Sequence, residues 1–126
     1  MSLRFTLCLG LAAIAVGVLA GPAFAHHGWG GNLDEEFTLS GTVERGVSLA
    51  GPHATMRLKA ANGQIWDLTL APPPRTEAAG LKEGIIPVGA QVTAEGHRNR
   101  DPKKFEMKTE RLIWNGRTFN VYPDRK

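Results

Sequence analysis

The stretch of sequence that decides the fold reads ATMRLKAANGQIWDLTL and covers residues 54–70. Apolar and polar residues alternate on both sides of Asn62-Gly63, a dipeptide typical of two-residue hairpin turns. Alternation with a period of two predicts strands that bury one face. We therefore expect a hairpin of strands 54–60 and 64–70, whose inward residues are Ala54, Met56, Leu58, Ala60, Trp66, Leu68 and Leu70.

Similar alternation continues on both sides of this hairpin. Further strands are predicted at residues 37–44, 90–96, 105–114 and 118–122, the last after a second Asn-Gly turn at 115–116. Three prolines at 72–74 end the first run of strands. Residues 75–81 form the one segment that is predicted to be helical, about two turns long, and Gly80 limits its length.

This order of elements is β-β-β-α-β-β with an added C-terminal strand. It predicts a mainly β domain at residues 36–126, a small OB-like β-barrel whose helix lies between the third and fourth strands. A closed barrel also removes the free strand edges that promote aggregation. The alternative is an open β-sandwich in which residues 75–81 form only a loop.

The first 25 residues are typical of a cleaved signal peptide. Arg4 precedes an uncharged apolar run from Phe5 to about Leu19, and residues 23–25 read Ala-Phe-Ala, a cleavage pattern of small residues. A retained membrane anchor is the alternative, but the run has about 15 residues and a spanning helix needs roughly 20. We expect cleavage after Ala25, a mature chain that begins at His26, and a periplasmic or secreted location.

Export changes which classes of function remain plausible. Loss of Arg4 leaves 14 basic against 12 acidic residues, a net charge of +2, and the one cysteine, Cys8, is lost as well. A basic loop at residues 98–104 occupies a position where OB-type proteins contact oligonucleotides, but only Phe105 there could stack on a base. We interpret this loop as solvated and expect no nucleic-acid partner and, after cleavage, no membrane.

Signatures of enzymes are missing from the sequence. It has no Gly-x-Ser-x-Gly motif, no phosphate-binding Gly-Lys-Ser/Thr loop and no dinucleotide fingerprint. We therefore expect a protein without catalytic activity and with no catalytic residues to assign.

The new N-terminus is the strongest candidate for chemistry. Residues 26–35 form a Gly-rich arm that begins His26-His27 and is predicted to be flexible unless something holds it. After cleavage His26 offers an α-amine and a ring nitrogen, which can chelate one ion together. A further imidazole completes an all-nitrogen site that suits Cu(II), the arrangement called a histidine brace.

Two other histidines could complete this site. Both His53 and His97 lie at strand ends, on the outward-facing parity of their strands, so neither is expected to be a core residue. The end of the fourth strand should lie near the start of the first, which favours His97 as the partner of His26 or His27. His53 is expected toward the opposite end of the first strand, within reach of a ten-residue arm.

Short motifs at 25–29, 41–43, 51–53 and 97–101 resemble, in order and spacing, those of a family of small exported bacterial proteins of unknown function. Its members show Ala-His-His-Ser/Gly plus an aromatic, then Gly-Thr-Val, Asn-Pro-His and His-x-x-Arg-Asp/Gly. This chain has Gly51 in place of the usual Asn and lacks the Trp often found just ahead of that motif. The resemblance implies that all four histidines occupy pattern positions, but it supplies no established activity.

Three functions follow as hypotheses. The leading one is binding of a metal ion, copper favoured, through His26 with help from His27, His53 or His97, for metal carriage or buffering. The second is a non-metal binding module for an unidentified periplasmic protein, with the histidines as surface residues. The third is a copper-dependent oxidoreductase.

Overall fold

The computed structural model describes residues 29–125, so the predicted signal peptide, His26 and His27 lie outside the described residues. Its elements, in chain order, are β1 (Phe37–Ser48), β2 (Thr55–Ala60), β3 (Ile65–Thr69), α1 (Pro73–Ala78), β4 (Gln91–Arg98), β5 (Glu106–Trp114) and β6 (Arg117–Asn120). None of the helices in this range is long and apolar enough to cross a membrane.

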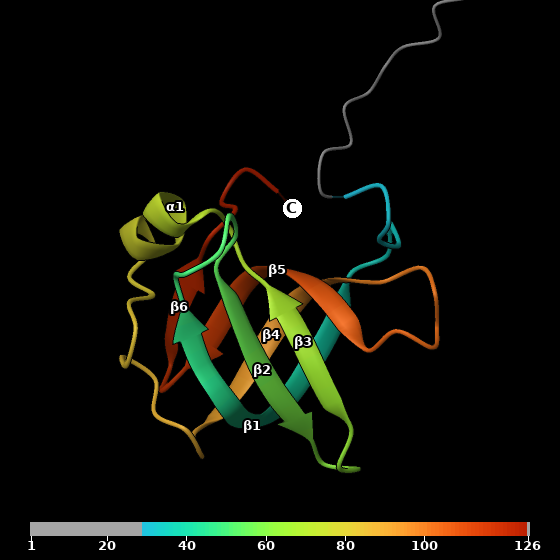
Figure 1. Cartoon of the computed structure of the whole chain (residues 1–126), viewed down its shortest axis with the longest axis horizontal. Coiled ribbons are helices and arrows are strands. Elements are labelled where there is room, and N and C mark those ends of the chain that lie inside the picture. Colours follow the sequence, from blue (N-terminus) through green and yellow to red (C-terminus); the bar gives the residue numbers. More distant parts are fainter. Residues whose placement is uncertain (1–28, 126) are drawn as a thin grey trace, which may run out of the picture.

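The strands close into a barrel (Figure 1). They pair in the order β3-β2-β1-β4-β5-β6, and β3 also pairs in parallel with β5, through Asp67 opposite Glu106. This pairing joins both sides of the sheet into five closed strands, while β6 extends from β5 as an added strand. The predicted OB-like barrel is therefore confirmed, and the open sandwich is wrong.

The predicted inward residues fill the barrel. Of the seven residues named for the central hairpin, all but Ala60 are buried, and Ala60 packs against the core from its edge. Val92 and Ala94 of β4 and Phe119 of β6 belong to the same cluster. Alternation was a sufficient guide here because each of these strands buries one face.

Two local predictions need correction. The first hairpin turn is centred on Ala61-Asn62, since Gly63 donates its amide to Ala60 O and has a left-handed φ of 86°. This is a longer turn with glycine in the left-handed position, instead of a two-residue turn at Asn62-Gly63. The helix begins earlier than expected, at Pro73, because proline fits the first helical position.

A bend in β1 determines which residues meet. Its register with β2 shifts between Val43 and Arg45 and again between Arg45 and Ser48. Such irregularities bend a strand, and Figure 1 shows that β1 turns back toward the end of the barrel at which it starts. Both ends of β1 therefore lie at one end of the barrel, with the described residues that directly adjoin them.

Candidate functional site

A row of paired residues crosses this end of the barrel. Thr55 of β2 pairs with Thr69 of β3, Thr69 with Lys108 of β5, and Lys108 with His97 of β4. His53 precedes the first of these by two residues. We call this region, defined by His53, His97 and Lys108, the histidine end. His53 does lie beside the far end of β1, as expected, since Ser48 pairs with Thr55. The bend in β1 brings that strand end, and with it the start of β2, to the histidine end.

The N-terminal arm is attached at the same place. Leu33 N donates to Arg98 O at 2.9 Å, Arg100 N donates to Gly31 O at 2.9 Å, and Asn32 Nδ2 donates to His97 O at 2.8 Å. The pairing of Phe37 with Gly96 confirms that the end of β4 adjoins the start of β1. Hydrogen bonds therefore hold residues 31–33 of the predicted flexible arm against β4.

His97 is buried, contrary to its predicted surface position. Its parity does direct it out of the barrel, but the arm covers it and only 8% of its surface remains exposed. The Trp29 ring lies edge-on to the His97 imidazole, with the two ring centroids 5.7 Å apart. Nδ1 donates to Leu33 O at 2.8 Å, and Nε2 lies 2.7 Å from Glu110 Oε1. Both ring nitrogens are thus engaged by oxygen atoms.

Glu110 is a site residue that the sequence analysis missed. Glu95 pairs with Arg111 and Gly96 with Thr109, so Glu110 is an extra residue in β5, a β-bulge. The bulge breaks the alternation and turns the carboxylate, 2% exposed, toward His97. The same carboxylate accepts from Arg111 Nη1 at 3.3 Å and from Arg125 Nε at 3.2 Å.

Aromatic and cationic side chains surround this pair. Trp29 packs edge-on to Tyr122 with centroids 5.2 Å apart, and the Arg125 guanidinium lies 3.8 Å from the Trp29 centroid. Lys108 Nζ lies 4.8 Å from the same centroid. Burial and the nearby Arg125 charge lower the pKa of Lys108, while burial raises the pKa of Tyr122.

The positive charge of Lys108 affects the pKa of His53. The pKa of His53 lies below its ordinary value of 6.5, first because burial disfavours the imidazolium and second because Lys108 repels it. Because the folded pKa is lower than the unfolded one, protonation of His53 opposes folding as the pH falls below 6.5.

We expect an NMR titration to place the midpoint of His53 below 6.5. Lys108→Met should move this midpoint upward without restoring it fully, because burial is the larger cause and the substitution leaves it in place. Lys59→Met, at an exposed position of β2, is the control and should cause no shift. A wild-type midpoint at or above 6.5, or equal shifts in both variants, would contradict this assignment.

The described residues do not form a metal site by themselves. Within residues 29–125 no group of three or more His, Cys, Asp or Glu side chains is placed to hold a metal ion. Of the four predicted ligands, the structure places His53 and His97 at the histidine end, and His26 and His27 lie outside the described range.

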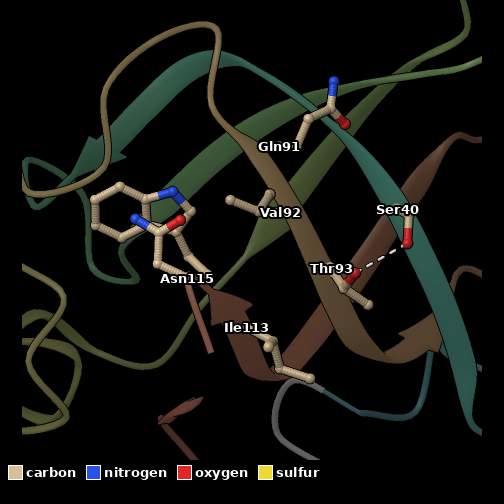
Figure 2. A pocket seen from close by; sticks show the side chains of 7 residues that line it. Ser40, Gln91, Val92, Thr93, Ile113 and Asn115 are labelled. Atoms are coloured by element: carbon tan, nitrogen blue, oxygen red, sulfur yellow. Dashed lines mark hydrogen bonds between the residues drawn. The ribbon is translucent and has the colours of Figure 1, made fainter. Parts of the chain in front are cut away.

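A shallow pocket lies elsewhere, on the outside of β1, β4 and β5. Figure 2 shows the hydrogen bond between Ser40 and Thr93 that crosses it, at 2.9 Å. Its volume is about 290 Å³, and its lining residues are Ser40, Gln91, Val92, Thr93, Ile113, Trp114 and Asn115. No titratable side chain lines this pocket.

The aromatic side chains next to the basic loop at residues 98–104 pack against one another. Phe105 packs edge-on to Trp66 with centroids 5.3 Å apart, and Trp66 stacks on Phe37 at 5.2 Å. The Arg98 guanidinium lies 5.1 Å from the Trp66 centroid. The ring that could stack on a base is therefore already in contact with the barrel wall.

A closed five-stranded barrel with a helix between β3 and β4 defines a small OB-type β-barrel domain as the class of protein. Histidine, lysine and carboxylate side chains gather at one end of it. The chain belongs to DUF6152, a family of unknown function, whose family model matches residues 13–108. The search of curated proteins finds no match.

Among solved structures, the barrel is similar to a crystal structure of the ZRD-deleted mutant of TiaS in complex with agmatine. The TM-score is 0.52 at 11% sequence identity, and the match covers 73% of this chain. It covers only 28% of the TiaS chain, so this chain corresponds to a minor part of that protein. The likeness concerns the fold alone.

Proposed function

We propose that this protein is exported and that its mature form, beginning at His26, binds a metal ion, with copper favoured. The observation that carries the proposal is the contact between Trp29 and His97, with ring centroids 5.7 Å apart. Trp29 follows His26 by three residues, and a chain spans at most about 3.6 Å per residue. This short spacing supports the proposal, because it lets the terminal amine and imidazole of the mature chain reach the histidine end.

His53 is the better third ligand. Both ring nitrogens of His97 already meet oxygen atoms, so a metal on Nε2 would have to displace the Glu110 carboxylate. His53 has no hydrogen-bonded ring nitrogen among the contacts of residues 29–125. We assign the brace to His26 and His53, with His27 as a further donor. His97 supports the Trp29 side of the site and keeps its contact with Glu110.

Copper titration of the mature chain tests this proposal. Calorimetry on protein with a native His26 terminus should give one Cu(II) bound at about micromolar affinity or tighter. One extra residue ahead of His26 should weaken binding at least tenfold, because the α-amine is then replaced by an amide. His53→Ala should weaken it by a similar factor, whereas Asn62→Ala, at an exposed turn, should not.

Other results would point to the other functions. Binding weaker than micromolar would refute the metal site and leave a binding module without metal. Binding unchanged by the extra residue would refute the brace, because the α-amine would then not be a ligand. Peroxide chemistry that requires the bound copper would instead indicate an oxidoreductase.

A further inference from the structure

Lys108 holds a charge that the surrounding residues do not neutralise. Only 4% of its surface is exposed, although it sits on the same outward side of the barrel as its pairing partner His97. None of the ion pairs among residues 29–125 includes Lys108. Its ammonium faces the Trp29 ring at 4.8 Å and the Tyr122 ring at 6.0 Å. Contact with aromatic faces compensates a buried ammonium less than a paired anion does.

Further cations gather around the same two rings. Arg125 lies 3.8 Å from the Trp29 centroid, and Arg75 lies 5.5 Å from the Tyr122 centroid. The charges of Arg125 and Lys108 are close enough to disfavour one another, because Arg125 contributes to the lowered pKa of Lys108. Three cations therefore surround one pair of aromatic side chains.

The nearby carboxylate does not balance these charges. Glu110 is shared among His97 at 2.7 Å, Arg125 at 3.2 Å and Arg111 at 3.3 Å. Arg111 also pairs with Glu36 and Glu95, which places those carboxylates on the Arg111 side of the cluster. Positive charge is left over on the side of Lys108, Trp29 and Tyr122.

We propose that Lys108 and Arg125 bind a small oxyanion, a phosphate or a carboxylate, beside the contacting rings of Trp29 and Tyr122 at the histidine end. A guanidinium offers a planar pair of donors that matches either group, and an ammonium adds a point charge with free donors. The C-terminal segment that carries Arg125 lies at the same end of the barrel as the arm (Figure 1). The site therefore joins the two termini of the domain around one anion, and it does not depend on the proposed metal.

Calorimetry with inorganic phosphate at low ionic strength, on protein freed of metal by a chelator that is then dialysed away, tests the site. The chain from His26 is suitable because it contains every described residue, including the whole closed barrel and its core. We expect saturable binding of one phosphate, weakened at least tenfold by Lys108→Met. Arg125→Gln should weaken it about fivefold. Lys104→Met, in the exposed basic loop, is the matched control and should bind as the wild type does.

Parallel titrations with acetate and with chloride separate specific binding from screening. Saturable binding of phosphate or acetate that Lys108→Met and Arg125→Gln weaken supports the site. The ion that binds more tightly shows whether the site takes a phosphate or a carboxylate. The proposal would be overturned if chloride bound as tightly as phosphate, or if no oxyanion saturated the protein. It would also be overturned if Lys104→Met weakened phosphate binding as much as Lys108→Met does. If the Lys108→Met variant does not fold, the phosphate affinity of Arg125→Gln tests the proposal instead. The Arg125 side chain is 43% exposed, so its replacement leaves the core intact.

The two proposals fail independently. A chain with one extra residue ahead of His26 should lose copper but keep phosphate. Lys108→Met should lose phosphate while its α-amine remains intact for copper.

Discussion

Glu110→Ala is expected to lower the free energy of unfolding by about 3–5 kcal/mol, the cost of removing one member of a buried charge pair. The substitution leaves His97 and Arg111 without their shared carboxylate and opens a space beneath the arm. Urea denaturation of the chain from His26 measures the change. Glu106→Ala, an exposed residue of the same strand, is the control and should stay within about 0.5 kcal/mol of the wild type.

A paired substitution identifies the cause of that loss. His97→Phe combined with Glu110→Leu removes both polar partners, and buried pairs replaced by apolar groups of similar size are often nearly neutral. The double variant should therefore recover part of the stability lost in Glu110→Ala. A loss below about 1 kcal/mol for Glu110→Ala would show that the contacts with His97 and Arg111 contribute little.

Gly96→Ala should destabilise the barrel by about 3 kcal/mol or more, at the upper end of overpacking costs. A Cβ at this position would lie 2.0 Å from Lys108 O, a backbone atom that cannot move without breaking the pairing of β4 with β5. For a domain of this size the melting temperature should fall by roughly 12–24 °C. Thermal melting followed by circular dichroism measures it.

Alanine substitutions at two other glycines provide melting temperatures for comparison with Gly96→Ala. Gly31→Ala meets nothing within 4 Å and should melt as the wild type does, whereas Gly41→Ala, with its Cβ 2.7 Å from Lys59 O, should lie between the two. Equal melting temperatures for Gly96→Ala and Gly31→Ala would mean that β4 and β5 separate at no cost.

Sequence patterns predicted the fold well wherever one strand face is buried along its length. Residues 54–70 show this best, since their alternation gave both strands and nearly every inward residue. The same rule failed in β5, where four successive residues, Met107 to Glu110, are buried. Two features cause this failure: the bulge, which turns Glu110 inward, and the Trp29 and Tyr122 rings, which cover the outward-facing Lys108. No residue type in β5 indicates either feature in advance.

The candidate site was predicted in part. The approach of the arm to His97 followed from the antiparallel pairing of β1 with β4. The place of His53 beside the far end of β1 was predicted as well. Its position at the same barrel end as His97 was not, because this depends on the bend in β1, which arises from register shifts spread over several residues. Lys108 and Arg125 look like ordinary solvated charges in sequence, and only the packing of Trp29 and Tyr122 brings them together.

The parallel pairing of β3 with β5 also bears on how fast the chain folds. Asp67 and Glu106 meet across nearly forty intervening positions, whereas β2 and β3 are joined by a short turn. Closing a long loop costs chain entropy before any contact repays it, so domains dominated by distant pairings fold in milliseconds to seconds. The hairpin of β2 and β3 should form early. Until β5 pairs with β3, the edge of β3 that faces β5 remains unpaired. During that interval the nascent barrel is most exposed to aggregation and to proteases, and any factor that protects it is expected to act on that edge.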